Sequence, residues 1–135
     1  LAFQLRRGQK MTGCVTLKLR YSDFQTQTLQ KKISYTSADH ELLPIALELF
    51  DKLYTRRVLI RLIGIRFSDL VNGSYQISLF DDSEKMVDLY NAMDKIRQRF
   101  GDRAVLRAAG MDAKTIGRFN PFSGEPPPLL ANRRV

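Results

Sequence analysis

Polar and apolar side chains alternate along residues 12–35, and this alternation predicts a β-hairpin. Over residues 12–21 the apolar positions are Val15, Leu17 and Leu19, and the polar positions between them are Thr16, Lys18 and Arg20. A turn at residues 22–24 separates this strand from a second one over residues 25–35. The polar side of the second strand shows Thr26, Thr28, Gln30 and Lys32. One face of the predicted hairpin is therefore apolar, and the other is polar and cationic.

The segment RRVLIRLIGIRF, residues 56–67, is rich in β-branched and aliphatic side chains. Because it is too apolar for an edge strand, we expect a central strand that is covered by helices on one face. Its arginines then need the other face of the sheet. Arg61 and Arg66 have opposite parity, so a flat strand cannot show both on one face, and we expect a β-bulge near Gly64.

Two helices are predicted from apolar residues that recur at three- and four-residue intervals. The first follows polar helix-start residues at 36–40 and carries Pro44 within its first turn; its apolar positions are Leu42, Ile45, Ala46, Leu49, Phe50 and Leu53. The second is capped by Ser83 and ends at Gly101; its apolar positions are Met86, Leu89, Tyr90, Met93, Ile96 and Phe100. Residues 2–7 resemble a helix end, residues 103–109 one more strand, and residues 120–135 an extended Pro-containing tail. Together these elements predict an α+β fold, an antiparallel sheet with helices packed on one face.

The charge of the chain is strongly basic and unevenly distributed. The 135 residues carry a formal net charge of +8, with a pI near 9.9. Seven Lys or Arg face a single acidic residue, Asp23, over residues 1–36, whereas residues 81–94 are acidic. This distribution suggests a nucleic acid or an acidic surface as partner. The single Cys14 rules out an internal disulfide framework and fits a reducing cytoplasm, and no run of 18 apolar residues or signal peptide places the chain in a membrane.

Three segments resemble the C-terminal little-finger domain of Y-family DNA polymerases, the polymerase IV and ImpB/MucB/SamB group. They are GCVTLKLRYSDFQTQT, the helix LPIALELFDKLY and the strand VLIRLIGIRFSDL, and the resemblance covers roughly residues 2–72. In that family the domain is a four-stranded sheet with two helices on one face. The family's first strand and most of its first helix are missing from this chain. Domain boundaries follow: little finger over 1–72, a linker over 73–82, a C-terminal helix and strand over 83–118, and a tail over 119–135.

The resemblance implies that the open face of the sheet lies against DNA near the primer-template junction. The matching positions are Lys18, Arg20, Thr28, Gln30, Lys32, Arg61 and Arg66. Independently of the family, cations on adjacent antiparallel strands sit about 5 Å apart, which suits phosphate contacts that do not discriminate between bases. The family resemblance further implies a bacterial, nucleoid-associated protein of the cytoplasm that acts in translesion synthesis and DNA repair.

A second candidate site is the peptide Gln76-Ile77-Ser78-Leu79-Phe80. It resembles the Q-x-x-L-F peptide by which bacterial polymerases and repair factors bind the sliding clamp. Leu79 and Phe80 would enter an apolar pocket while Gln76 makes polar contacts at its rim. The alternation of Tyr75, Ile77 and Leu79 also fits a packed strand end.

Catalytic chemistry is not expected from this chain. His40 is better explained as a surface or capping residue, Cys14 as a small packed residue, and the acidic Asp81, Asp82 and Glu84 as a charge bias at a helix N-terminus. No metal site or cofactor is therefore expected here. The catalytic carboxylates and Mg²⁺ of the family's nucleotidyltransferase reaction belong to a preceding palm domain.

The sequence leaves two other functions open. One is a protein-interaction module in which only the residue 76–80 peptide matters, and the other is a stand-alone RNA-binding α+β domain. RNA-binding sheets usually stack bases on exposed aromatic residues, whereas the outward positions here hold Thr, Gln, Lys and Arg. A homodimer that pairs an unpaired sheet edge is a further option.

Overall fold

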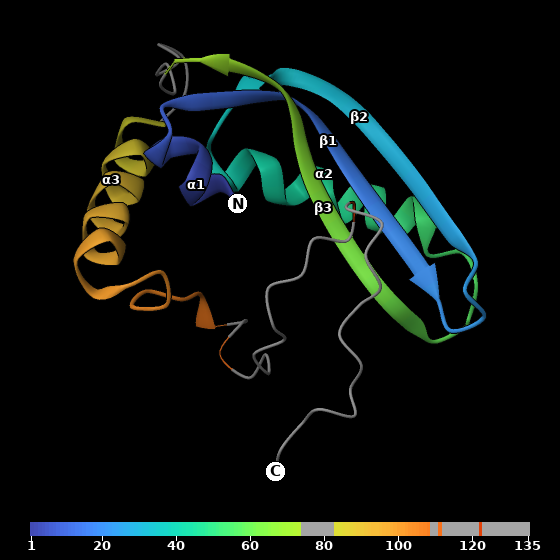
Figure 1. Cartoon of the computed structure of the whole chain (residues 1–135). Helices are drawn as coiled ribbons and strands as arrows, with labels where there is room; N and C mark the ends of the chain where they lie inside the picture. Colours follow the sequence, from blue (N-terminus) through green and yellow to red (C-terminus); the bar gives the residue numbers. More distant parts are fainter. Residues whose placement is uncertain (74–82, 109–110, 112–121, 123–135) are drawn as a thin grey trace.

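The computed structural model describes residues 1–73 and 83–108, together with residues 111 and 122. Its elements are α1 (Ala2–Arg7), β1 (Lys10–Tyr21), β2 (Thr26–Thr36), α2 (Asp39–Leu53), β3 (Ile60–Asn72) and α3 (Ser83–Phe100). The three strands form an antiparallel sheet in the order β2-β1-β3, and α2 runs behind them (Figure 1). This confirms the predicted hairpin and the α+β class.

The central strand is β1, and the prediction that the apolar segment 56–67 is central was wrong. The segment forms β3, which begins at Ile60 and has β1 as its one strand neighbour among the described residues. The apolar composition of a strand indicates that it is buried, and a helix can bury it as well as another strand can. The position of a strand in the sheet depends instead on how many strands pair with it. The outer part of β3 remains accessible to solvent, since Ile63 is 52% exposed.

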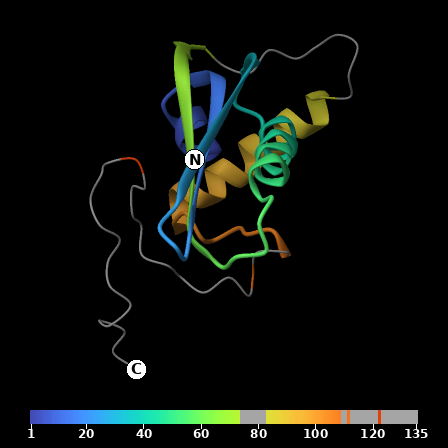
Figure 2. The same ribbon diagram turned by 90° about the vertical axis from the view of Figure 1, so that its right-hand side faces the viewer.

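The main core lies between the sheet and α2. Leu42, Leu49 and Leu53 of α2 pack with the odd-numbered residues of β1, which are Val15, Leu17, Leu19 and Tyr21. The Tyr21 hydroxyl is buried and donates a hydrogen bond of 2.9 Å to the carbonyl of Leu53. In the view of Figure 2, α2 stands on one side of the sheet. The other side, which we call the open face, is thereby left without a helix of the main core.

Pro44 lies deeper in α2 than the sequence suggested. The helix begins at Asp39, so Pro44 falls in its second turn rather than its first. A proline there removes the hydrogen bond that the carbonyl four residues earlier, at His40, would otherwise accept. The helix nevertheless continues to Leu53, because its apolar face is held by the sheet.

Gly13 occupies a point where β2 and β3 approach each other across β1. The Tyr35 hydroxyl of β2 donates a hydrogen bond of 3.2 Å to the Asp69 carboxylate of β3. A Cβ atom at position 13 would lie 2.6 Å from the Tyr35 ring and 2.7 Å from that carboxylate. The negative charge of Asp69 raises the pKa of the Tyr35 hydroxyl. A larger residue here would therefore force the Tyr35 and Asp69 side chains to move, because of close packing rather than an unusual backbone angle.

An ion-pair cluster joins α1, α2 and α3. The Arg6 guanidinium donates to Asp94 of α3 through Nε at 2.5 Å and Nη2 at 3.0 Å. It also donates to the Asp39 carboxylate at 3.0 Å and to the carbonyl of Ser37 at 2.8 Å. Burial disfavours the charge of Arg6, but the hydrogen bonds to Asp94 and Asp39 outweigh burial and raise its pKa. We call Arg6, Asp39 and Asp94 the Arg6 cluster.

Tyr90 completes the docking of α3. Its ring lies 5.0 Å beneath the Arg6 guanidinium, and its hydroxyl accepts a hydrogen bond of 2.9 Å from the backbone N–H of His40. The His40 and Tyr90 rings are also stacked, with centroids 5.8 Å apart. His40 therefore contacts α3 at the start of α2.

The docked face of α3 agrees only in part with the predicted apolar face. Tyr90 of that face is buried, as is the charged Asp94, whereas Leu89, Ile96 and Phe100 are exposed. The ion pair between Asp94 and Arg6 therefore contributes to which side of the helix faces the domain. No described helix is long and apolar enough to cross a membrane.

The strand expected over 103–109 is absent from residues 103–108. After Gly101, which has a positive φ of 98°, the chain makes turns and bends at residues 102–105. The Arg97 guanidinium donates to the carbonyl of Val105 at 3.1 Å, so this segment folds back on α3. The carbonyl of Val105 thus accepts its hydrogen bond from a helix side chain, and the segment pairs with no strand in the described structure.

Candidate nucleic-acid interface

The open face of the sheet gathers the predicted polar residues of β1 and β2. The register pairs Lys18 with Thr28 and Arg20 with Thr26. Directly paired residues project from the same face of an antiparallel sheet, with Cβ atoms about 4.5–5.5 Å apart. The Arg20 Nε donates a hydrogen bond of 2.8 Å to the Thr26 hydroxyl, which orients that guanidinium across the two strands.

The centre of the open face is Thr16 of β1. It pairs with Gln30 on β2 and with Arg66 on β3. Lys32 lies further along β2, opposite Cys14. Six of the seven predicted DNA-binding residues thus share one face by register: Lys18, Arg20, Thr28, Gln30, Lys32 and Arg66. The four on β2 and β3 are exposed, and the two on β1 are half-buried.

The seventh predicted residue, Arg61, lies at an irregularity in β3. Leu62 pairs with Arg20 and Ile60 pairs with Tyr21, so Arg61 is the extra residue of a β-bulge. A bulge was expected, but near Gly64, which instead pairs regularly with Lys18. The exposed Arg61 guanidinium lies 4.6 Å from the centre of the Phe24 ring in the β1–β2 turn. Arg61 therefore adds a cation at the hairpin end of the sheet.

Strand parity separates two neighbouring lysines. Lys31 faces α2, where its ammonium group lies 2.5 Å from the Glu48 carboxylate. Glu48 also accepts a hydrogen bond of 2.6 Å from Lys52, and the two lysines lower the pKa of Glu48 to about 2. Lys32 has the opposite parity and is exposed on the open face. Every charged residue at an open-face position of the three described strands is Lys or Arg, and no Asp or Glu occupies such a position.

Thr16 is a site residue that sequence reasoning passed over. Alternation placed it on this face, but the family resemblance did not include it among the matching positions. In the structure it is 1% exposed, and its hydroxyl has no hydrogen-bond partner among the described residues. A buried polar group without a partner costs about 1–3 kcal/mol, so this hydroxyl is an unpaired donor at the centre of a cationic surface.

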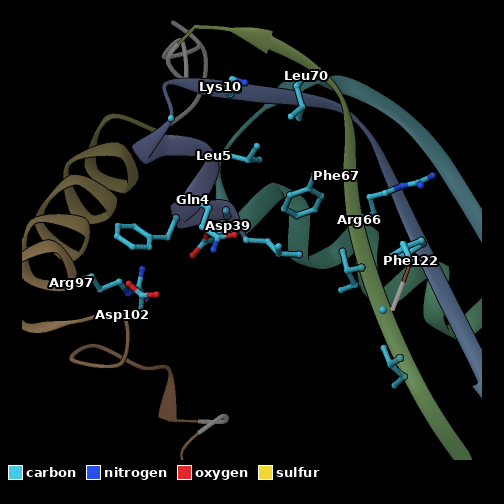
Figure 3. A pocket seen from close by; sticks show the side chains of 17 residues that line it. Gln4, Leu5, Lys10, Asp39, Arg66, Phe67, Leu70, Arg97, Asp102 and Phe122 are labelled. Carbon is cyan, nitrogen blue, oxygen red and sulfur yellow. The ribbon is translucent and has the colours of Figure 1, made fainter. Parts of the chain in front are cut away.

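Phe122 was also missed, because it lies in the segment predicted to be an extended Pro-containing tail. Its ring centre is 4.9 Å from the Arg66 guanidinium carbon and 5.4 Å from the Lys18 ammonium. In Figure 3, Arg66 and Phe122 lie on the same side of β3, whereas Phe67 points to the opposite side. No local pattern in the sequence connects residue 122 with β1 or β3.

A groove of ≈1460 Å³ opens between α1 and β3 (Figure 3). Its lining combines apolar residues of α1 and β3 with the charged Asp39, Arg97 and Asp102. Within the part of the chain that the structure describes, no three His, Cys, Asp or Glu residues form a group that could hold a metal ion. Cys14 is buried in β1 with a free thiol.

The predicted clamp-binding residues Gln76, Ile77, Leu79 and Phe80 lie outside the described residues, as do Asp81 and Asp82. The structure does place the chain on either side of them. β3 ends at Asn72, and the backbone N–H of Gly73 donates a hydrogen bond of 2.9 Å to the carbonyl of Gln9. The helix α3 begins at Ser83.

Comparison with known proteins shows which family this domain is similar to. The C-terminal domain of the impB/mucB/samB family matches residues 1–79. A DNA polymerase IV of Clostridium acetobutylicum is 31% identical over 112 residues, which cover 80% of this chain and 28% of that protein. A DNA polymerase IV of Dehalococcoides mccartyi is 32% identical over 103 residues, which cover 75% of this chain and 26% of that protein. The chain therefore spans little more than a quarter of the length of these curated relatives.

Proposed function

Because the chain belongs to the impB/mucB/samB family as its C-terminal domain, we propose that its open face holds the backbone of primer-template DNA for a lesion-bypass DNA polymerase. The observation that carries the proposal is that the charged side chains of the open face are all positive. Lys18, Arg20, Lys32 and Arg66 project from three adjacent strands, with no carboxylate between them among the described residues. The opposite face is occupied by α2 and the core.

The chemistry of this face suits binding that is independent of sequence. Lysine and arginine on a sheet surface contact phosphate oxygens, which fix the position of a protein on DNA but carry no base information. Thr28 and Gln30 add neutral hydrogen-bonding groups between the cations. A polymerase domain that must hold damaged templates needs this indifference to the bases. The nucleotidyl transfer itself, with its Mg²⁺, would be carried out by another part of the whole protein.

The proposal predicts a steep dependence of DNA binding on salt. Fluorescence anisotropy with a labelled primer-template duplex, measured between 50 and 200 mM salt, should give a log–log slope of about −4 to −5. This is the slope expected if the four open-face cations and Arg61 each contact one phosphate. Duplexes of unrelated sequence should bind equally well. Absence of binding at the lowest salt, or a salt-independent affinity, would contradict the proposal. Tighter binding of single-stranded RNA than of duplex DNA would favour the RNA-binding alternative.

We further propose that the Gln76–Phe80 peptide tethers the protein to a bacterial sliding clamp. What supports it is the Q-x-x-L-F pattern and its position directly after the domain that the family match covers. Leu79 and Phe80 would each contribute roughly 1.5–3 kcal/mol by burial, before ordering costs. The tether would raise the effective concentration of the domain at the DNA that the clamp encircles.

Truncating the two apolar side chains should abolish this tether. Leu79→Ala/Phe80→Ala is expected to weaken binding to an immobilised bacterial sliding clamp by at least about tenfold, measured by surface plasmon resonance. Lys32→Gln is the matched control, because it changes the open face and should leave clamp affinity unchanged. Equal clamp affinity of the wild type and the double variant would refute the tether.

A further inference from the structure

The Thr16 hydroxyl and the Phe122 ring mark the same part of the open face. Arg66 is the direct cross-strand partner of Thr16, and Lys18 is the next residue of β1 on the same face. The Phe122 ring lies over both of these cations, at 4.9 Å from Arg66 and 5.4 Å from Lys18. We call Thr16, Lys18 and Arg66 the central site.

The central site offers two kinds of interaction, and the ring uses one of them. An aromatic face attracts a cation through its quadrupole, so one ring can engage Lys18 and Arg66 together. The same ring supplies no conventional acceptor for a hydroxyl donor, and the buried Thr16 hydroxyl has no partner in the part of the chain that the structure describes. The Phe122 ring therefore occupies the central site but leaves the Thr16 hydroxyl without a hydrogen bond.

A phosphate group would satisfy all three residues. Its oxygens accept hydrogen bonds from both cations and from the Thr16 hydroxyl. Charge-assisted hydrogen bonds of this kind are roughly twice as strong as neutral ones. A cation–π contact at an exposed site is the weaker interaction. Phosphate and ring cannot occupy the same space over Lys18 and Arg66.

We propose that Phe122 is an intramolecular occupant of the central site and competes there with a phosphate of bound DNA. The inference rests on the proposed function, since it takes the open face as the DNA-binding surface. In the absence of DNA the ring covers the two cations. When DNA binds, a phosphate displaces the ring and accepts a hydrogen bond from Thr16.

Removing the ring should strengthen DNA binding. Phe122→Ala is expected to tighten the affinity for primer-template duplex by about two- to tenfold, because the binding-competent population rises. Phe100→Ala is the matched control: Phe100 is 68% exposed and also lies beside an arginine, but it belongs to α3. The control should bind DNA as the wild type does. Equal affinity of Phe122→Ala and the wild type would overturn the competition.

The role of Thr16 is tested by an isosteric substitution. Thr16→Val removes the hydroxyl and retains the shape of the side chain. In the Phe122→Ala background it should weaken duplex binding by about tenfold, which corresponds to one hydrogen bond to a charged group. An unchanged affinity would remove Thr16 from the phosphate site.

A measurement without DNA separates this inference from the proposed function. The NMR resonances of the Arg66 guanidinium should carry a ring-current shift in the wild type that disappears in Phe122→Ala. If the shift is absent while DNA binding remains salt-dependent, the ring contact is wrong and the proposed function stands. If the shift is present but neither protein binds DNA at low salt, the proposed function fails, and the competition fails with it.

Discussion

Reversing two central charges is expected to reduce duplex affinity by about 10²- to 10³-fold at low salt. The variant Lys18→Glu/Arg66→Glu removes two phosphate contacts and places two carboxylates where phosphates would lie. The salt slope should become shallower by at least about two, since each lost contact removes roughly one counterion equivalent. Both side chains project from the open face rather than into the core, so the fold should be retained.

The control for this variant carries the same charge change on another surface. Lys85→Glu/Lys95→Glu alters two exposed residues of α3, away from the open face. A general effect of net charge would weaken DNA binding equally in both double variants. A specific phosphate site would show the large loss only at Lys18 and Arg66, and similar losses in the two variants would contradict the assignment of the open face.

The neighbouring lysines of β2 provide a finer comparison. Lys31→Gln and Lys32→Gln make the same chemical change one residue apart, but Lys31 is paired with Glu48 on the helix face and Lys32 is exposed on the open face. If the open face is the DNA-binding surface, as proposed, Lys32→Gln should weaken duplex binding more than Lys31→Gln does.

Breaking the Arg6 cluster is expected to cost about 2–4 kcal/mol of folding stability. Arg6→Ala removes the bidentate partner of the Asp94 carboxylate, which is 11% exposed and, among the described residues, keeps only the 3.4 Å ion pair with Arg97. A largely buried carboxylate that loses its main partner is destabilising. We expect the loss in urea unfolding, together with faster amide hydrogen exchange in α3, because Arg6 and Tyr90 make the hydrogen bonds that join this helix to the domain, and the Arg97–Phe3 contact alone is weaker.

Arg7→Ala is the matched control for the cluster. It removes the same kind of side chain from the next position of α1, where the arginine is exposed, and should change stability by no more than about 0.5 kcal/mol. Duplex affinity should be unchanged in both variants, since neither residue belongs to the open face. If Arg6→Ala were no more destabilising than Arg7→Ala, α3 would not depend on the ion pairs for its position.

The cluster also explains how a helix beyond the family match is attached to the domain. The impB/mucB/samB domain matches residues 1–79, and α3 begins at Ser83. Its contacts reach back to Arg6 in α1 and to Asp39 and His40 at the start of α2. The segment that contains the proposed clamp-binding peptide is consequently connected at both ends to ordered structure.

Local pattern was sufficient for the hairpin and for the side on which its polar residues project. Alternation with a period of two is a property of the extended backbone itself, so Lys18, Thr28 and Lys32 could be assigned to one face before any pairing was known. The apolar period of residues 42–53 predicted the face of α2 in the same way, and Leu42, Leu49 and Leu53 are buried as expected.

Properties that depend on pairing could not be deduced from one segment alone. Whether a strand is central depends on how many neighbours it has, and the apolar composition of β3 did not reveal that. The bulge was correctly required by the parity of Arg61 and Arg66, but its position is set by the register with β1. The strand expected after Gly101 is absent from the described residues, where the carbonyl of Val105 accepts hydrogen bonds from Arg97 of α3 instead.

By itself, then, the sequence determined the secondary structure of the first 72 residues, the cationic face and the family resemblance, because these depend on periodicities and motifs within short segments. The tertiary structure alone decided that Asp94 of α3 is docked against Arg6, since the two residues are 88 positions apart in the sequence. It also decided that Phe122 lies over Lys18 and Arg66. The physical reason is the same in both cases: a charged or aromatic side chain selects its partner by proximity in the folded chain, and no local pattern encodes that proximity.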